Sequence, residues 1–168
     1  MTTQTKARTL DKSALILRLR ELLDEGLAHD SIVERLDPVR GIGITEQFVS
    51  DALTVISNAL AIAPEVGNKS MDEAHTRVIG QTRLADEFDS DLPKKQTYLG
   101  HQHRRDQPIL EHELARLEAE RARLRGLANE AAFQWQSVQE KRIPFDQARS
   151  DFPSAFLEFP DWRPNPRK

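Results

Sequence analysis

The sequence of 168 residues contains no cysteine and only one tyrosine, with seven phenylalanines and two tryptophans. A chain without cysteine has no disulfide framework, no thiolate nucleophile and no zinc site that uses cysteine ligands. Hydrophobic residues make up 38% of the chain and charged residues 30%, so apolar side chains are scarcer than in an ordinary globular domain. We therefore expect a small core with extended parts rather than one compact core that uses the whole chain.

The sequence also lacks a long hydrophobic run. The first ten residues are polar, and the richest early apolar run is interrupted by Arg18 and followed by Arg20. No stretch approaches the roughly 18 consecutive apolar residues of a membrane span, and none is typical of a signal peptide. We expect a soluble, cytoplasmic protein with no membrane partner. The net charge of −3 also lacks the overall basic balance that is typical of nucleic-acid-binding domains.

The chain is predicted to be mostly α-helical, and residues 10–62, after a flexible arm over residues 1–9, predict a small three-helix domain. We expect Gly26 to end the first helix and the Ser31–Glu34 capping box to begin the second. Thr45 is a typical N-cap for the third helix, and Pro64 is expected to mark its end. The three apolar faces comprise Leu15, Leu19, Leu22 and Leu23; Ile32, Val33 and Leu36; and Phe48, Val49, Leu53, Ile56 and Leu60.

Residues 63–108 show no sustained apolar period. Glycine, proline, asparagine, aspartate and serine are scattered through them. We predict a linker with one short helix around residues 71–88.

Residues 109–142 carry the clearest pattern, in which key positions alternate by four and three residues. This spacing is typical of a long, coiled-coil-type helix that packs against a partner helix. An arginine in the stripe and two alanines after it disfavour a long parallel dimer; they favour a shorter contact or an antiparallel hairpin within the chain. The stripe consists of Leu110, Leu114, Leu117, Arg121, Leu124, Ala128, Ala131, Trp135 and Val138. Its leucines, Trp135 and Val138 are the first set of candidate protein-interaction residues.

The last segment, residues 143–168, is rich in aromatic residues and proline. Pro153 is suited to open a helical turn that Pro160 closes. The rings are too many for so short a segment to bury by itself. It either straps the chain's own helices, with Phe133 and Trp135 as receivers, or docks on another protein. Its candidate interaction residues are Phe152, Phe156, Phe159 and Trp162.

Residues 22–36 resemble the opening of a helix-turn-helix domain, with Leu22, Leu23, Gly26 and Leu27 followed by Ile32 and Leu36. The resemblance implies that residues 45–60 form a recognition helix. Two features depart from it: the turn over residues 37–44 is longer than usual, and residues 41–68 contain no lysine or arginine. Since lysine and arginine supply most affinity for phosphates, a scaffold without DNA binding is the simpler interpretation.

The basic residues outside the expected recognition helix are the candidates for nucleic acid. A stretch before the long helix is suited to clamp a phosphate backbone, with its tyrosine stacked on a base. The alternative is a solvated loop. The candidate nucleic-acid residues are Arg35, Arg40, Lys94, Lys95, Tyr98, Arg104 and Arg105.

Signals for catalysis or cofactor binding are weak. His101 and His103 are two residues apart, a spacing that does not suit ligands on a helix, and a solvated loop is the simpler interpretation. No dinucleotide loop, phosphate loop or Gly-x-Ser-x-Gly elbow is present. We predict no catalytic, cofactor or metal site.

These patterns favour a non-enzymatic subunit, adaptor or regulator that joins a larger assembly through its long helix and aromatic tail. Self-association is included in this prediction. The alternative is a DNA-binding regulator with a divergent helix-turn-helix and a helical dimerisation element.

Overall fold

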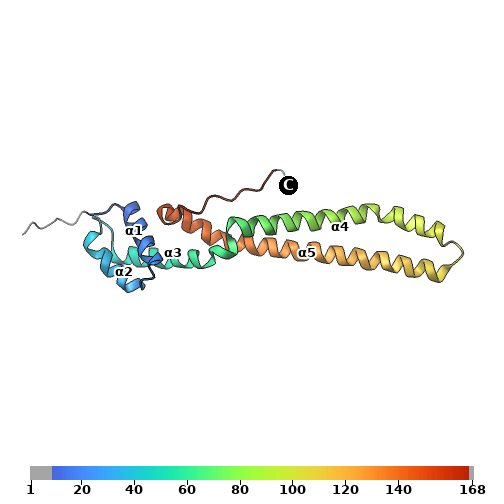
Figure 1. Ribbon diagram of the computed structural model, residues 1–168, viewed down its shortest axis with the longest axis horizontal. Helices are drawn as coiled ribbons and strands as arrows, with labels where there is room; N and C mark the ends of the chain where they lie inside the picture. Colours follow the sequence, from blue (N-terminus) through green and yellow to red (C-terminus); the bar gives the residue numbers. More distant parts are fainter. Residues whose placement is uncertain (1–8, 167–168) are drawn as a thin grey trace, which may run out of the picture. The chain divides into compact units, whose positions relative to one another are not determined.

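The computed structural model describes residues 9–166, in which every regular element is helical and no strand occurs. This confirms the mostly α-helical prediction. The elements are α1 (Lys12–Asp24), α2 (His29–Leu36), the short 3-10 turn η1 (Asp37–Val39), α3 (Glu46–Val66), α4 (Asn68–Gln102), α5 (Gln107–Asp151) and the 3-10 turn η2 (Pro153–Ala155) (Figure 1).

The described chain forms two compact units. The core unit comprises the residues up to Asn68 together with residues 141–161. The hairpin unit comprises residues 69–140 and the residues from Trp162 onward. Helix α5 supplies residues to both units.

Local signals in the sequence set the boundaries of the first and third helices. Asp11 caps α1 by accepting a hydrogen bond from the backbone N–H of Ala14 at 2.7 Å. Gly26 follows α1 with φ of +83°, a conformation that favours glycine. Thr45 caps α3, and its hydroxyl accepts from the N–H of Phe48 at 3.1 Å. The roles predicted for Gly26 and Thr45 are confirmed.

The predicted start of the second helix is wrong. Helix α2 begins at His29 with Ala28 as its N-cap, and Ser31 lies inside the helix rather than at its end. The backbone already closes a helical bond from the N–H of Ile32 to the carbonyl of Ala28, so no capping box forms at Ser31. His29 lies 3.0 Å from the hydroxyl of Ser57 and links the start of α2 to α3.

Helix α3 supplies the middle of the core unit. Val49, Leu53 and Ile56 have no exposed surface, and Leu15 and Leu19 of α1 belong to the same buried cluster. By length and composition alone α3 is apolar enough to cross a membrane, but a core helix of a soluble protein passes the same test. Helix α3 ends at Val66, two residues beyond Pro64.

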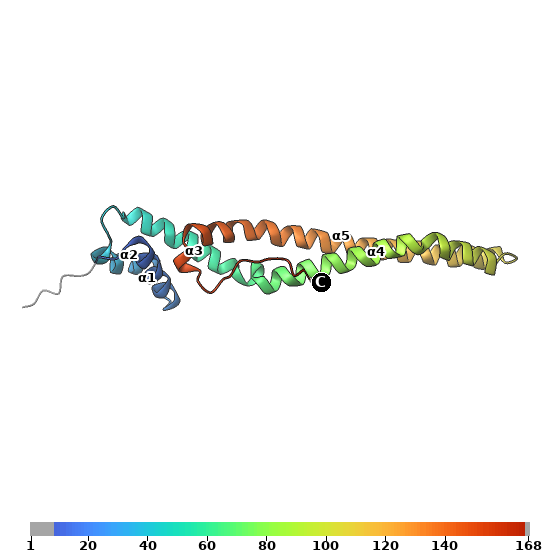
Figure 2. The ribbon, with the colours of Figure 1, turned by 90° about the horizontal axis from the view of Figure 1, so that it is seen from above.

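The helix predicted around residues 71–88 is confirmed, but the linker predicted around it is wrong, because most of residues 63–108 form the 35-residue helix α4. Helices α4 and α5 lie side by side in opposite directions and are joined by a short turn at residues 103–106 (Figures 1 and 2). In the hairpin unit, Asp89 bonds Arg121 while the earlier residue His75 contacts the later residue Trp135. These contacts fix an antiparallel register.

Only one row of residues along α4 is consistently apolar. This explains why the sequence of α4 shows only a weak helical periodicity of apolar residues. A residue in every seventh position is buried or half-buried and apolar: Met71, Val78, Ala85, Leu92 and Leu99. The neighbouring row is half-buried but polar or charged: His75, Thr82, Asp89 and Gln96. Apolar side chains therefore recur at one position in every seven residues of α4. The usual heptad pattern has two apolar positions in every seven, so α4 does not show it.

The predicted end of the long helix is also wrong. Helix α5 continues through Pro144 to Asp151, so the first nine residues of the predicted tail are helical. A proline inside a helix costs about 3 kcal/mol, which tertiary contacts must offset. Phe145 and Ala148, one and four residues further on, are 1% exposed and belong to the buried cluster of the core unit. Their burial holds this stretch in helical form.

Candidate protein-interaction surface

The stripe predicted on the long helix lies inside the hairpin unit. Leu110, Leu114, Leu117, Leu124, Trp135 and Val138 are all half-buried, and Ala128 and Ala131 are buried. Trp135 contacts His75 of α4 with ring centroids 5.1 Å apart. These residues therefore serve the contact of α5 with α4, and they do not form a free docking stripe.

The aromatic tail packs on the chain's own core unit. Phe156 is 3% exposed and its ring centroid lies 5.8 Å from that of Phe145, which is 5.4 Å from that of Phe159. Phe152 is half-buried, with its ring 6.2 Å from Phe48 of α3. Pro153 opens η2, as its position predicts. Of the two predicted roles, the structure places these three phenylalanines in a strap on the core.

Polar contacts hold the strap in place. Arg20 of α1 donates to the carbonyl of Ala155 at 2.5 Å and forms an ion pair with Glu158 at 2.5 Å. Burial disfavours its charge, but hydrogen bonds to Asp24 and Glu158 outweigh this and raise the pKa of Arg20 above its ordinary value. From α5, Arg149 donates to the carbonyl of Phe159 at 2.7 Å.

Trp162 belongs to an aromatic cluster of the hairpin unit. Its ring centroid lies 5.4 Å from His75 and 5.5 Å from Trp135. Its indole N–H donates to the carboxylate of Asp72 at 2.8 Å. The two tryptophans of the chain are therefore both in this unit, and their fluorescence reports its state.

A charged cluster fixes the middle of the hairpin unit. The carboxylate of Asp89 accepts from Arg125 at 2.5 Å and from Arg121 at 3.1 Å, and Arg125 also bonds Asp86 at 3.2 Å. Hydrogen bonding from Arg125 lowers the pKa of Asp89, with Arg121 adding to the shift against partial desolvation. The same bonds, to Asp89 and Asp86, raise the pKa of Arg125. An ion pair in a helical seam favours one register over others.

Acid is expected to weaken the hairpin unit through Asp89. Because its folded-state pKa is lower than its unfolded value of about 3.9, its stabilisation is present above that pH and is lost as the pH falls through the folded-state pKa. Asp89→Asn is therefore expected to lower the Tm at pH 7, and the difference between the two proteins is expected to shrink as the pH falls below the unfolded value of about 3.9. Thermal unfolding followed by tryptophan fluorescence measures this. The matched control is Glu130→Gln, an exposed carboxyl of the same unit. A constant difference between wild type and Asp89→Asn from pH 7 to pH 3 contradicts the assignment.

Large apolar side chains remain exposed on the hairpin unit. Phe133 is 73% exposed, Tyr98 65% and Leu84 46%. Two shallow grooves lie between α4 and α5, one lined in part by Ala74, Phe133 and Val138, the other by Lys95, Tyr98 and Leu117. From the sequence, Tyr98 is a candidate nucleic-acid residue, Phe133 is a receiver for the strap, and Leu84 is one of the apolar residues of the short helix predicted around residues 71–88; none of the three is predicted to be an exposed contact of a helical hairpin.

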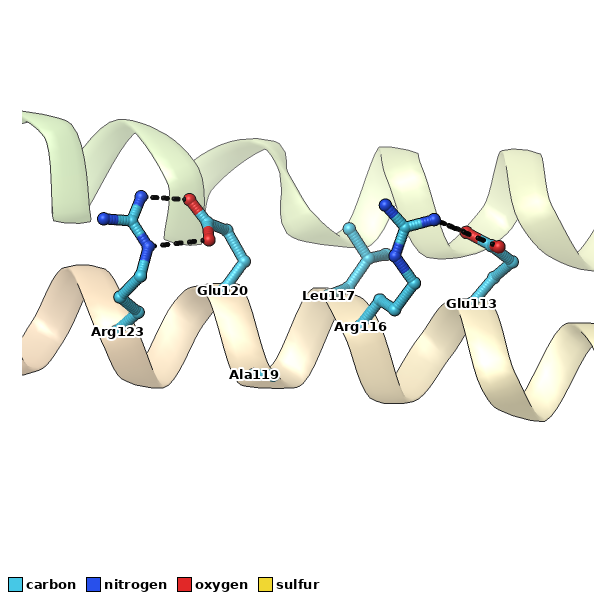
Figure 3. Close-up of a pocket in the computed structure, with 6 residues that line it drawn as sticks. All are labelled: Glu113, Arg116, Leu117, Ala119, Glu120 and Arg123. Atoms are coloured by element: carbon cyan, nitrogen blue, oxygen red, sulfur yellow. Dashed lines mark hydrogen bonds and ion pairs between the residues drawn. The ribbon is translucent and has the colours of Figure 1, made fainter.

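A third groove lies along α5 and is bordered by paired charges. Arg123 bonds Glu120 at 2.6 Å, and Arg116 bonds Glu113 at 3.2 Å. Figure 3 shows Leu117 between these pairs, extending toward the neighbouring helix. Since the charges already neutralise one another, this groove offers no concentrated charge to a ligand.

The candidate nucleic-acid residues fall into separate units. Arg35 and Arg40 belong to the core unit, where Arg40 is paired with Asp37. Lys94, Lys95, Tyr98, Arg104 and Arg105 belong to the hairpin unit and are exposed, but the first three lie on α4 rather than in the predicted loop. The exposed face of α3 presents Glu46, Gln47, Ser50 and Asp51, which are acidic or neutral.

The histidines and carboxylates show no metal-binding arrangement within residues 9–166: no group of three or more is placed to hold an ion. His101 lies on α4, and His103 lies in the turn that follows it. Compared with known protein families, with curated proteins and with solved structures, the chain gives no match.

Proposed function

We propose that the chain is a non-enzymatic interaction subunit or adaptor that joins a larger assembly through its helical hairpin. The aromatic tail is a strap on the core unit in this proposal. The binding element is the hairpin unit, formed by residues 69–140 with the residues from Trp162 onward.

The incomplete burial of the hairpin unit carries this proposal. Only Met71, Ala85, Leu92, Ala128 and Ala131 of its described residues are buried apolar side chains. A helix with an apolar stripe is stable when that stripe is covered, and a hairpin of two helices covers only the seam between them. The seam does not bury Phe133, Tyr98 and Leu84, which remain exposed. A further helix packed on the hairpin would cover them.

DNA binding through α3 is less well supported. The exposed residues of its first two turns are Glu46, Gln47, Ser50 and Asp51, and residues 41–68 contain no lysine or arginine. Such a helix is repelled by phosphates rather than attracted to them. It remains the alternative that an experiment must separate from protein binding.

Site-specific photo-crosslinking of the full chain in its native cells tests the proposal. A benzoylphenylalanine at Phe133 is expected to form covalent adducts with protein, because this side chain is the most exposed aromatic residue of the hairpin unit. The matched control is the same probe at Thr76, an exposed position on α4. Equal labelling at the two positions, or adducts with nucleic acid alone, would overturn the proposal.

A further inference from the structure

Helix α4 carries a second stripe beside the one that faces α5. Its positions alternate by three and four residues: Ala74, Arg77, Gln81, Leu84, Phe88, Asp91, Lys95 and Tyr98. We call this stripe the outer face of α4. Residues at these spacings lie along one side of a helix. Leu84 is near the middle of the stripe and Tyr98 is at one end, and both are exposed.

The two grooves between the helices lie at the two ends of the outer face. One, of about 320 Å³, is lined by Ser70, Glu73, Ala74 and Arg77 together with Phe133, Gln134, Ser137 and Val138. The other, of about 350 Å³, is lined by Lys94, Lys95, Tyr98 and Leu99 together with Glu113 and Leu117. The exposed ring of Phe133 lines the first groove, and the exposed ring of Tyr98 lines the second.

Three charged residues of the outer face, Arg77, Asp91 and Lys95, have no ion pair among residues 9–166, and the first two are of opposite sign. Arg77 is bonded to the neutral amide oxygen of Gln134, at 2.9 Å, and Asp91 has no ion pair. They lie seven residues before and seven residues after Leu84. Several other charges of α4 are paired within the chain: Arg83 pairs with Glu87, and Asp86 pairs with Arg125.

We propose that the outer face of α4 binds the same face of a second copy, antiparallel, with Leu84 on the two-fold axis. This pairing places Arg77 of each copy opposite Asp91 of the other, because both are seven residues from the axis. It also places Glu73 opposite Lys95. A two-fold interface is self-complementary in this sense, so each contact occurs twice.

The same register supplies a site for the exposed tyrosine. Tyr98 is fourteen residues after Leu84, and its symmetry mate in the second copy is therefore Ser70, fourteen residues before. Ser70 lines the groove that contains Ala74, Phe133 and Val138. Each Tyr98 ring thus enters this groove of the other copy and covers its exposed Phe133, which joins the two hairpins into a four-helix bundle.

The charges select the antiparallel orientation. A parallel pairing would set Arg77 against Arg77 and Asp91 against Asp91, and like charges brought together are destabilising. The opposite side of α4 exposes Ile79, but its charged neighbours Arg83 and Glu87 are already paired with each other. That side therefore has no unmet charge for a second copy to neutralise.

The absence of cysteine makes a disulfide test direct. Leu84→Cys in the full chain is expected to form a covalent dimer under mild oxidation, because two copies of this position meet at the axis. Ile79→Cys, on the opposite side, is the matched control and is expected to stay monomeric. A mixture of Arg77→Cys and Asp91→Cys proteins is expected to form the mixed disulfide. Each protein alone is expected not to, because its own copies lie about 21 Å apart along the helix axes.

Charge reversal provides a second, independent measurement. Arg77→Asp or Asp91→Arg alone is expected to raise the dimer Kd by roughly tenfold or more, since each substitution creates two like-charge contacts. The double variant Arg77→Asp with Asp91→Arg is expected to restore the dimer. Sedimentation equilibrium measures the Kd, and far-UV circular dichroism verifies that these variants of exposed or surface-facing side chains stay helical.

This inference rests on the proposed function, but the two fail differently. A chain that stays monomeric at high concentration, or that crosslinks equally through Leu84→Cys and Ile79→Cys, overturns the dimer. If the photoprobe at Phe133 still labels a different protein, the proposed function stands without self-association. Labelling of the chain itself together with the Leu84→Cys dimer supports both.

Discussion

Phe156→Ala is expected to lower the free energy of unfolding of the core unit by about 3–5 kcal/mol, the usual cost of removing a buried phenylalanine ring. Phe156 is 3% exposed and lies between Phe145 and Phe159, with ring centroids 5.8 Å and 6.1 Å away. The tilted and edge-on contacts of these rings add to the loss of buried area. Denaturant unfolding followed by far-UV circular dichroism gives the free energy, and hydrogen exchange locates the change in α1 and α3.

The adjacent residue provides the matched control. Leu157 is 74% exposed, so Leu157→Ala is expected to change stability by no more than about 0.5 kcal/mol. Two small effects of equal size, with unchanged exchange in α1 and α3, would show that the strap is not part of the core. The comparison separates burial of the ring from any general effect of altering the tail.

The tail shows how far sequence reasoning reaches. The spacing of Phe152, Phe156 and Phe159 predicts that they share a side, and their number predicts that something must cover them. It does not state whether the cover comes from the same chain. Arg20 of α1 and Phe48 of α3 decide that question, since both contact the strap from more than a hundred residues away in sequence. Such pairings depend on three-dimensional proximity, which local spacing does not encode.

Helix α4 shows a different limit. Its seam is half polar, because His75, Thr82, Asp89 and Gln96 occupy positions that usually carry leucine or valine. The signal that was available is the strict seven-residue recurrence from Met71 to Leu99. The antiparallel hairpin that the stripe on the long helix allows agrees with the structure, but the sequence predicts only residues 71–88 of its partner helix, which runs from Asn68 to Gln102.

The candidate interaction surface was predicted only in part. The predicted leucines of α5 are half-buried against α4, and Phe152, Phe156 and Phe159 of the tail pack on the core unit, so the fold uses these residues internally. Exposed residues such as Leu84 stand out only after the seam is known, because the seam determines which apolar side chains are left over. A sequence pattern identifies apolar faces but does not say which face another part of the chain covers.

Arg142→Met is expected to destabilise the core unit by about 1–3 kcal/mol, the usual cost of leaving a buried hydrogen-bond acceptor without its donor. Arg142 is the one buried charged residue of the described chain, at 4% exposed. Its guanidinium donates to the carbonyl of Val66 at 2.7 Å, to the side-chain oxygen of Asn68 at 3.1 Å and to Asp146 at 3.1 Å. The carbonyl of Val66 is one of those that the end of α3 leaves without a helical partner, and Val66 is fully buried.

Methionine preserves most of the apolar stem of Arg142 but leaves the Val66 carbonyl without a donor, and an unsatisfied buried acceptor costs about 1–3 kcal/mol by itself. Arg142→Lys is expected to recover only part of the loss, because one ammonium cannot reproduce the planar fork that reaches Asp146 from one nitrogen and Val66 from another. Lys141→Met is the control, since the ion pair of Lys141 with Glu65 is long, at 3.8 Å, and exposed to solvent. Equal denaturation midpoints for Arg142→Met and Lys141→Met would contradict this role. A clear loss of unfolding free energy for Arg142→Met, with none for Lys141→Met, would show that one buried arginine satisfies the end of α3 and holds α5 against it. Arg142 lies two residues before Pro144, the proline inside α5.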